Sequence, residues 1–312
     1  MQISENVTLQ DKNWFKTGGT ADYFCEPENQ DDFKEALIFA KKNRLEFFLL
    51  GEGANLLFSD RGFKGLVIRP AFLNIETENT APDYALVRAG CGVKMDSLIE
   101  FCLANKLTGL EEFSGIPGTI GGSVYINIHY MEFLLSSFLV KAYVLSKEGE
   151  VLTVDNSWFN FGYDQSRLHS KDYFLMDASF KLKKTTEAFV SFARGRKSEI
   201  IRHRNHRYPS KNSCGSFFRN FSDEEVCFEI GGSKILSVAY YLEKVGVKGS
   251  LKVGDAKVSQ KHSNMIENLE AATSADIIAV AREMQKKVFS EFGLLPKAEC
   301  QFAGFESYPI LR

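Results

Sequence analysis

Residues 115–123, which we call the second glycine segment, have the composition of a backbone that binds anions. The sequence Gly-Ile-Pro-Gly-Thr-Ile-Gly-Gly-Ser holds four glycines and one proline. Glycine adopts positive φ and has no side chain, so amide N–H groups can point at an approaching oxyanion. A glycine-rich turn that binds no ligand is the alternative interpretation.

A similar stretch, the first glycine segment at residues 51–56, follows the apolar run Phe-Phe-Leu-Leu at residues 47–50. This pattern predicts a buried strand, a turn that exposes amides and the side chain of Asn55, and then another strand. The segment lacks the third glycine and the helix-opening context of a Rossmann fingerprint. The chain has no lysine-bearing phosphate loop, which argues against nucleotide hydrolysis. Two glycine segments predict a bound dinucleotide whose diphosphate is held from two sides.

The composition is that of an enzyme with large hydrophobic cores. With 312 residues, 44% of them hydrophobic, the chain can form two or three domains. A formal net charge of −2 and a pI near 6.3 provide no global field for nucleic acid. Basic residues concentrate at 194–197 and 202–207. They indicate either a solvated helix face or an electrostatic guide for an anionic substrate.

The six cysteines show neither metal-ligand spacing nor a Cys-x-x-Cys pair, so we expect no metal site. The first residues contain no basic region followed by an apolar one, so we expect no signal peptide. No apolar run approaches the ~20 residues of a membrane span. We therefore expect a cytoplasmic protein with reduced thiols and no membrane or nucleic-acid partner.

Hydrophobic periodicity predicts an α+β fold. Helical spacing of apolar residues predicts helices at residues 31–43, 95–104, 187–205, 235–245 and 275–292. Apolar runs predict strands at residues 65–69, 84–90 and 174–182, and a hairpin formed by 138–145 and 151–154. The polar stretch 183–187 indicates a boundary. The expected parts are residues 1–184, with lobes of about 1–70 and 71–184, residues 185–298 and residues 299–312.

Six segments along the chain are similar to those of one enzyme family. Two of them read Asn-Trp-Phe-Lys-Thr-Gly-Gly at 13–19 and Ser-Cys-Gly-Ser-Phe-Phe-Arg-Asn at 213–220. The others are residues 51–57, 109–122, 254–264 and 299–304. In this order they resemble the UDP-N-acetylenolpyruvoylglucosamine reductase family over nearly the whole chain. The chain lacks the long tyrosine-bearing insertion of some members, which is typical of the shorter subtype.

The resemblance implies a two-lobed FAD-binding domain of the vanillyl-alcohol-oxidase/PCMH type at residues 1–184. It also implies a smaller α+β substrate domain at 185–298 and a final segment, 299–312, that returns to the active site. FAD should be bound non-covalently, because Ala54 and Asn55 stand where some related flavin oxidases carry a flavin-linked histidine. The expected cofactor-binding residues are Gly51, Glu52, Gly53, Ala54, Asn55, Leu56, Gly115, Ile116, Pro117, Gly118, Thr119, Gly121, Gly122 and Ser123.

The reaction implied by the resemblance has two steps. NADPH reduces bound FAD, and the flavin then delivers hydride to the β-carbon of the enolpyruvyl group of UDP-N-acetylglucosamine enolpyruvate. The product is UDP-N-acetylmuramate, a peptidoglycan precursor. Negative charge that develops on the neighbouring carbon requires a proton donor and groups that stabilise an enolate.

Ser216 and Glu299 match the catalytic residues of the family. Ser216 lies in a Gly-Ser-Phe-Phe-x-Asn motif whose serine donates the proton, and a turn or cap serine is the alternative. Glu299 lies five positions before Gly304, as the family's glutamate does. A protonated carboxyl there would donate to the enolate, and a surface glutamate is the alternative. The resemblance also implies substrate contacts for Asn220.

Two places in the chain depart from the family. Tyr163 matches, but Asp164 stands where the family has a catalytic arginine. Arg167 either supplies the missing cation to the substrate or lies on a solvated loop. Residues 127–132 read Asn-Ile-His-Tyr-Met-Glu where the family usually has Asn-Ala-Gly-Ala-Tyr-Gly. Within them, His129 is either a donor to the flavin ring or a core histidine.

These departures keep two other functions open. The first is a flavin-dependent oxidoreductase of the same fold that acts on another anionic substrate. The second is a non-catalytic protein that binds FAD and a nucleotide sugar, although a binding module has no need of a proton donor. The sequence indicates neither a preference between NADPH and NADH nor the oligomeric state.

Overall fold

The structure is a computed structural model that describes residues 1–210, 212–229 and 231–312. Its contacts divide the chain into two compact units. Unit 1 comprises Met1–Ser4, Phe24–Glu52 and Leu66–Arg204, and unit 2 comprises Glu5–Tyr23, Gly53–Gly65 and Asn205–Arg312. The expected domain boundaries at residues 184 and 298 stay a prediction.

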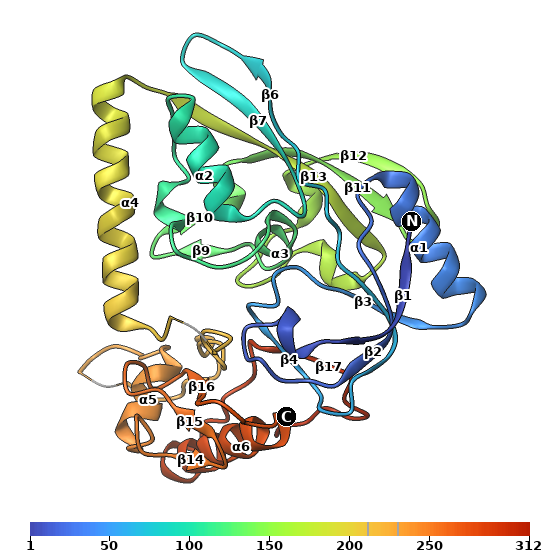
Figure 1. The fold of residues 1–312 in the computed structure, drawn as a ribbon. Helices are drawn as coiled ribbons and strands as arrows, with labels where there is room; N and C mark the ends of the chain where they lie inside the picture. Colours follow the sequence, from blue (N-terminus) through green and yellow to red (C-terminus); the bar gives the residue numbers. More distant parts are fainter. Residues whose placement is uncertain (211, 230) are drawn as a thin grey trace. The chain divides into compact units, whose positions relative to one another are not determined.

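The centre of unit 1 is an antiparallel sheet with the strand order β12-β11-β13-β7-β6, in which β8 also pairs with β13. The strands are β6 (Ile75–Thr80), β7 (Tyr84–Gly90), β8 (Leu107–Thr108), β11 (Leu139–Ser146), β12 (Val151–Asp155) and β13 (Tyr173–Lys184). Figure 1 shows the β11–β12 hairpin. The sequence predicted this hairpin, and its turn contains Gly149 at φ +92°.

Four α-helices accompany this sheet, namely α1 (Gln30–Lys42), α2 (Met95–Ala104), α3 (Ile120–Tyr125) and α4 (Glu187–Arg207). The side chain of Asn29 caps α1 by accepting from the amide of Asp32. On the buried face of α1, Phe33 packs against Phe174 of β13 with ring centroids 5.8 Å apart. The predicted helix at 95–104 is confirmed at both ends. Helix α3 was not predicted, because its first half is rich in glycine.

The basic residues 194–197 of α4 are held by carboxylates of the same unit. Arg196 forms two hydrogen bonds of 2.9 Å with Glu112, and the ammonium of Lys197 lies 2.7 Å from Glu100. These cations therefore fasten α4 to its neighbours, and the interpretation of 194–197 as an electrostatic guide is not supported. Figure 1 shows α4 as the long yellow helix beside α2.

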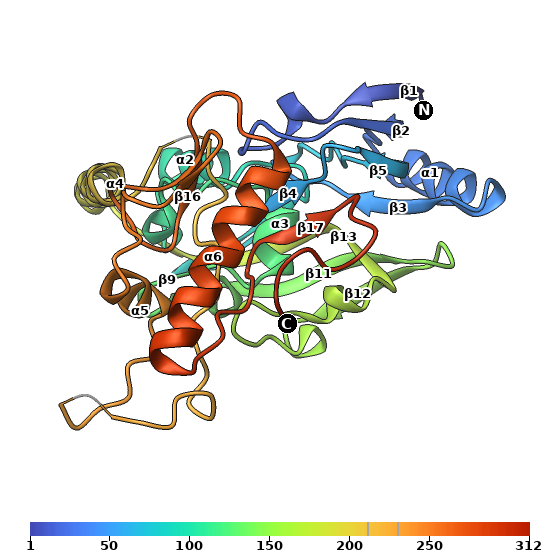
Figure 2. The same cartoon turned by 90° about the horizontal axis from the view of Figure 1, so that it is seen from below.

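The described part of unit 2 contains the α-helices α5 (Val238–Lys244) and α6 (Ser274–Phe292). Its short strands are β14 (Lys252–Val253), β15 (Ala256–Val258) and β16 (Ile266–Asn268), which form one sheet, and β4 (Leu56–Phe58) and β17 (Gln301–Ala303), which pair in parallel. Thr273 caps α6, and Gly293 ends it at φ +67°. The apolar face of α6 joins Phe217, Phe218 and Tyr241 in one buried cluster. Figure 2 shows β17 beside β4.

The remaining elements are short, or they are strands whose residues belong partly to unit 1 and partly to unit 2. A four-stranded sheet has the order β1-β2-β5-β3. Its strands are β1 (Ile3–Thr8), β2 (Thr20–Cys25), β3 (Glu46–Leu49) and β5 (Phe63–Ile68), and β9 (His129–Tyr130) pairs with β10 (Phe133–Leu134). Single 3-10 turns are η1 (Gln10–Lys12), η2 (Glu111–Phe113), η3 (Leu135–Ser137), η4 (Ser157–Phe159) and η5 (Arg167–Ser170). Within the described ranges, the helices are all too short or too polar to cross a membrane.

Candidate active site

The second glycine segment lies in unit 1 and begins as a turn before it enters helix α3. Several of its amides are already paired, which corrects the expectation that they are free. The amide of Gly118 donates to Oε2 of Glu52 at 2.8 Å. The amides of Ile120 and Gly121 donate to backbone carbonyls at 2.8 Å. These amides are therefore not available to an anion. What the segment provides is backbone without side chains, which a ligand can approach closely.

The glycines differ in what a side chain would meet. A Cβ atom added to Gly51 would lie 2.8 Å from Oγ1 of Thr119, so a side chain there would displace the hydroxyl that caps α3. At Gly118 and Gly122 the nearest protein atoms would be 3.9 and 3.8 Å away. Gly118 also has φ +143°, a conformation that side chains disfavour. The backbone at these two glycines is therefore open to a ligand.

The second half of the first glycine segment lies in unit 2, where Gly53 packs on residues near the N-terminus. A Cβ atom at Gly53 would lie 2.5 Å from the carbonyl oxygen of Lys12. Oδ1 of Asn55 and Oγ1 of Thr17 are buried without a hydrogen-bond partner in the structure. A buried polar atom without a partner costs about 1–3 kcal/mol, so both atoms mark positions where a ligand would provide donors.

The candidate proton donor Ser216 lies in residues 213–220, which we call the serine segment. Ser216 forms a β-bridge with Met265 on one side, and Phe218 forms one with Ala298 on the other. Phe217 and Phe218 are 0% and 1% exposed, as expected for core residues. Ser216, between Gly215 and these rings, is half-buried, and its bridge to Met265 fixes its backbone.

Asn264 holds the backbone beside Ser216. Its Nδ2 donates to the carbonyl of Phe218 at 2.7 Å, and its Oδ1 accepts from the amide of Phe218 at 3.1 Å. Its own carbonyl accepts from the amide of Phe217 at 2.8 Å. In the sequence, Asn264 was noted only as part of a segment that matches the family. The pattern that could have indicated its structural role is a polar residue directly before the apolar pair Met265 and Ile266.

Neighbouring His262 is a neutral structural residue. Burial, together with the positive charges of Arg207 and Lys248, lowers the pKa of His262 to about 4. Its Nδ1 accepts from the amide of Asn264 at 3.2 Å. Because the imidazole is uncharged at neutral pH, it serves here as a hydrogen-bond acceptor.

Glu299 lies next to the serine segment in the same unit. Its amide donates to the carbonyl of Phe217 at 2.9 Å. Strand β17 begins two residues later and pairs with β4, which directly follows Asn55. The amide of Gln301 donates to the carbonyl of Asn55 at 3.1 Å. Unit 2 thus brings together Glu299, the serine segment and the end of the first glycine segment.

Asn220 is the last residue of the serine segment, and its side chain contacts the first residue of helix α5. The side chain of this exposed residue accepts from the amide of Val238 at 3.2 Å through Oδ1, and its carbonyl accepts from Arg219 at 2.7 Å. Its amide oxygen therefore has a structural role at a helix start. A contact with substrate stays a prediction.

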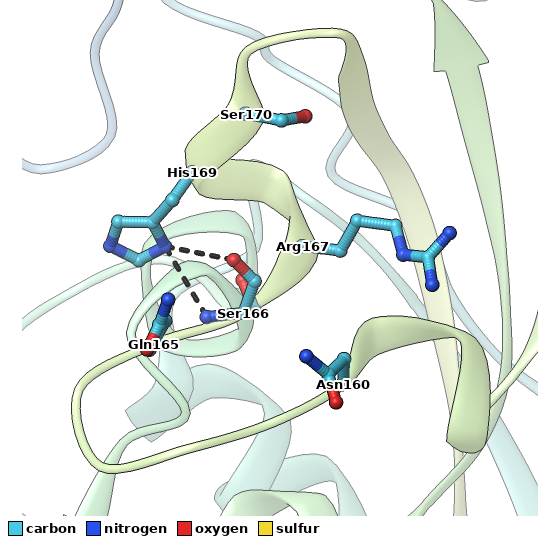
Figure 3. Close-up of a pocket in the computed structure, with 6 residues that line it drawn as sticks. All are labelled: Asn160, Gln165, Ser166, Arg167, His169 and Ser170. Atoms are coloured by element: carbon cyan, nitrogen blue, oxygen red, sulfur yellow. Dashed lines mark hydrogen bonds between the residues drawn. The ribbon is translucent and has the colours of Figure 1, made fainter.

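The loop that carries Tyr163 and Arg167 lies in unit 1. A pocket in this loop has a volume of about 220 Å³. The residues that line it are Asn160, Gln165, Ser166, Arg167, His169 and Ser170 (Figure 3). His169 points away from Arg167 and contacts the backbone of Ser166 through Nδ1. Burial lowers the pKa of His169, partly offset by the hydrogen bond to Ser166. The exposed Arg167 stacks on Trp158 at 4.9 Å, which favours the loop interpretation of this cation.

Two family models match the chain. One described as an FAD binding domain matches residues 21–155, and one described as the C-terminal domain of UDP-N-acetylenolpyruvoylglucosamine reductase matches residues 207–303. The UDP-N-acetylenolpyruvoylglucosamine reductase of Prochlorococcus marinus (strain NATL2A) is 30% identical over 307 residues, with 98% of this chain and 99% of the relative covered. The chain belongs to the UDP-N-acetylenolpyruvoylglucosamine reductase family.

Other members agree with this assignment. The reductase of Clostridium botulinum (strain Eklund 17B) is 29% identical, with 94% of this chain and 90% of the relative covered. The crystal structure of the Thermus caldophilus UDP-N-acetylenolpyruvylglucosamine reductase superposes with a TM-score of 0.78 at 26% identity and covers 97% of this chain and 99% of its own. The expected α+β fold with an FAD-binding domain is confirmed, and the chain is a flavin oxidoreductase with FAD as its cofactor.

The residues present fit this cofactor. In unit 1 the open backbone at Gly118 and Gly122 allows close approach by a large ligand. In unit 2 the buried oxygens of Asn55 and Thr17 lack donors that a ligand would provide. The sequence could not single out these residues. Whether a buried oxygen has a hydrogen-bond partner, or a glycine has open space beside it, depends on the folded structure.

The departure from the family at Asp164 has a structural counterpart in unit 1. Oδ1 of Asp164 lies 3.6 Å from Nδ1 of His129, which belongs to the second stretch that departs from the family, residues 127–132. The His129 ring also packs against Tyr163 with centroids 5.0 Å apart. The carboxylate is thus directed to a histidine of the same unit. His129 is half-buried rather than a core histidine.

Proposed function

We propose that this chain reduces the enolpyruvyl group of UDP-N-acetylglucosamine enolpyruvate with NADPH, giving UDP-N-acetylmuramate for peptidoglycan synthesis. The observation that carries the proposal is the meeting of Ser216 and Glu299 on neighbouring backbone segments of unit 2. These residues lie 83 positions apart, so their proximity is a property of the fold and not of the local sequence.

The two glycine segments are the proposed cofactor-binding residues. In unit 1 they are Gly51, Glu52, Gly115, Ile116, Pro117, Gly118, Thr119, Gly121, Gly122 and Ser123, and in unit 2 they are Gly53, Ala54, Asn55 and Leu56. Bound FAD would supply the hydride that originates from NADPH and is added to the β-carbon of the substrate. We expect this attachment to be non-covalent.

Ser216 and Glu299 handle the charge that hydride addition creates on the substrate. The Ser216 hydroxyl donates a proton to the carbon that bears the carboxylate. A protonated Glu299 donates a hydrogen bond to the enolate oxygen, which lowers the energy of the developing charge. Asn264 fixes the backbone beside Ser216, so the hydroxyl needs no reorganisation at the moment of transfer. Asn220 and Tyr163 are proposed to contact substrate, whereas Arg167, on the ring of Trp158, is proposed to lie on a solvated loop.

The proposal is tested by turnover with a defined substrate. Purified protein is mixed with NADPH and UDP-N-acetylglucosamine enolpyruvate, the absorbance of NADPH is followed, and the product is identified by mass spectrometry. NADPH consumption with formation of UDP-N-acetylmuramate supports the proposal. NADPH consumption that does not depend on the nucleotide sugar would refute it.

A second candidate function is reduction of a different anionic substrate. It is favoured by Asp164 and His129, which together change the charge where the family has arginine and a small residue. A panel of enolpyruvyl and α,β-unsaturated carboxylates in the same assay distinguishes the two functions. Turnover of a panel member, but not of the nucleotide sugar, favours this second function.

We further propose that the reaction takes place in the cytoplasm with the nucleotide sugar and NADPH as the small-molecule partners. The six cysteines are all unpaired, which is compatible with a reducing compartment. NADH in place of NADPH in the turnover assay decides which nicotinamide is used.

A further inference from the structure

The carboxylate of Glu225 binds four donors in unit 2. Nη1 and Nη2 of Arg219 donate to it at 2.8 Å each, in a two-pronged arrangement. The ammonium of Lys297 lies 2.7 Å from Oε1, and the amide of Ser222 donates to Oε2 at 2.8 Å. Such charge-assisted bonds are stronger than neutral ones, and the bidentate pair also fixes orientation.

The two cations belong to the two segments that carry the proposed catalytic residues. Arg219 follows Ser216 by three positions, and Lys297 precedes Glu299 by two. The backbones meet at the same place, because the amide of Arg219 donates to the carbonyl of Lys297 at 3.0 Å. Glu225 therefore joins the serine segment to residues 296–303, which we call the glutamate segment, through side chains that flank a backbone contact.

The arrangement also depends on the negative charge. Arg219 and Lys297 each approach the same carboxylate, so without it two cations would face each other. The side chain of Glu225 is 23% exposed, and partial exclusion of water strengthens both attractions. Loss of the charge would remove a link between the two segments and replace it with repulsion.

We propose that Glu225 is a positioning residue for the reaction, whose carboxylate sets the spacing between the Ser216 and Glu299 segments. This inference rests on the proposed function, because it assigns the need for that spacing to the transfer of a proton and the stabilisation of an enolate. A shift of about 1 Å in a reacting group can cost ~10²-fold in rate. Hydride transfer from NADPH to the flavin needs neither group, so it does not depend on Glu225.

The first test separates the two half-reactions in Glu225→Gln and Glu225→Asp. Glutamine keeps the size and loses the charge, whereas aspartate keeps the charge and shortens the reach. We expect flavin reduction by NADPH to stay within about twofold in both, and flavin reoxidation by the nucleotide sugar to slow by tenfold or more. Glu224→Gln, at the exposed neighbouring glutamate, is the matched control and should change neither step.

The outcomes of this test decide between positioning and other roles. Equal losses in both half-reactions would mean that Glu225 only stabilises the fold, and would overturn the proposal. Full activity of Glu225→Asp would show that a negative charge is enough and that the length of the side chain does not matter. This result would also overturn the proposal. Lys297→Met combined with Glu225→Gln should be no slower than Glu225→Gln alone, because both changes act on one bridge. Additive losses would contradict that bridge.

A second measurement does not use activity. Hydrogen–deuterium exchange is compared for peptides that cover the serine segment and the glutamate segment. Exchange should accelerate in both peptides in Glu225→Gln and match the unmodified protein in Glu224→Gln. Unchanged exchange in Glu225→Gln overturns the positioning role. Failure of the unmodified protein to turn over the nucleotide sugar instead refutes the proposed function, so the two failures are distinguishable.

Discussion

Ser216 is the residue on which the proposed chemistry depends most. A serine hydroxyl is a weak acid in water and transfers a proton only to a strong base, such as a carbanion held against it. The structure fixes the Ser216 backbone through bridges on both sides of the serine segment while its side chain remains half-buried. A proton donor requires such a rigid backbone, and the side chain must not be fully buried.

Ser216→Ala should abolish product formation and leave flavin reduction by NADPH nearly intact. The serine acts only on the carbanion, so its loss should slow the second half-reaction by roughly 10²–10⁴-fold. Stopped-flow absorbance of the flavin measures each half-reaction. Ser222→Ala, a nearby hydroxyl removal, is the control. Equal slowing of both half-reactions would make Ser216 a structural residue.

Arg167 is the second residue whose role can be decided by substitution. Its guanidinium lies on the ring of Trp158 in an exposed turn, and lysine keeps the charge there. We therefore predict that Arg167→Lys changes kcat by less than about twofold. A tenfold loss, equal to ~1.4 kcal/mol of transition-state stabilisation, would show that Arg167 binds the substrate through a geometry that lysine cannot reproduce.

At the level of elements, the sequence predicted the helices and strands that have a clear periodicity of apolar residues within their own segment. Helix α2 was predicted at both ends, since its buried residues repeat at helical spacing. Helix α5 begins at Val238 rather than at 235. Helix α3 was missed because its glycines lower helix propensity, and Thr119 becomes its cap only once the fold presents the turn.

The candidate site was predictable in its residue types but not in its contacts. The motifs pointed to Ser216 and Glu299 as candidates, and their catalytic roles stay predictions. Their proximity depends on pairing between segments far apart in sequence, which no local pattern encodes. For the same reason the amide of Gly118 was expected to be free, although Glu52 occupies it. The bridge made by Glu225 gave no sequence signal, because Glu225 ends the acidic run Asp223-Glu224-Glu225, and such residues normally lie on the surface.

The turn before α3 provides a test of cofactor binding. Gly118→Val should abolish flavin binding, since the branched side chain would fill the open approach to the backbone. Gly149→Val is a matched control, because Gly149 also has positive φ and an unobstructed Cβ position but lies in the β11–β12 hairpin. Flavin content after purification and circular dichroism are compared. Equal flavin loss in both variants would indicate strain alone.

The bridge at Glu225 also predicts a pH dependence of stability. The hydrogen bonds from Arg219 hold the pKa of Glu225 below its usual range, against the opposing effect of burial, and the Lys297 hydrogen bond lowers it further. A lowered folded-state pKa contributes stability that is present above the unfolded pKa of about 4.3 and is lost as pH falls toward the folded value.

Denaturant unfolding measures this contribution. At neutral pH the unfolding free energy of Glu225→Gln should be lower than that of the unmodified protein by roughly 1–3 kcal/mol. The difference should shrink as pH falls below about 4.3, where the unfolded carboxylate is protonated. Glu224→Gln should show no comparable difference. A gap that grows at acidic pH would contradict a lowered pKa at Glu225.

At the level of the whole molecule, the chain is similar over almost its full length to reductases of the family. Ala54 and Asn55 occupy the turn where some related oxidases attach the flavin, so acid precipitation should release all of the yellow cofactor. Mass spectrometry of the denatured chain should give the mass of the polypeptide alone. A mass increased by FAD would contradict non-covalent binding.

In the proposed reaction this chain passes a hydride from NADPH to an enolpyruvyl nucleotide sugar and completes the reduction by proton donation from Ser216. An anaerobic single-turnover experiment tests it most directly. The flavoprotein is first reduced with one equivalent of NADPH and then mixed with UDP-N-acetylglucosamine enolpyruvate. We predict rapid flavin reoxidation with one equivalent of UDP-N-acetylmuramate, and loss of both in Ser216→Ala. Flavin that stays reduced in the unmodified protein after the nucleotide sugar is added would contradict it.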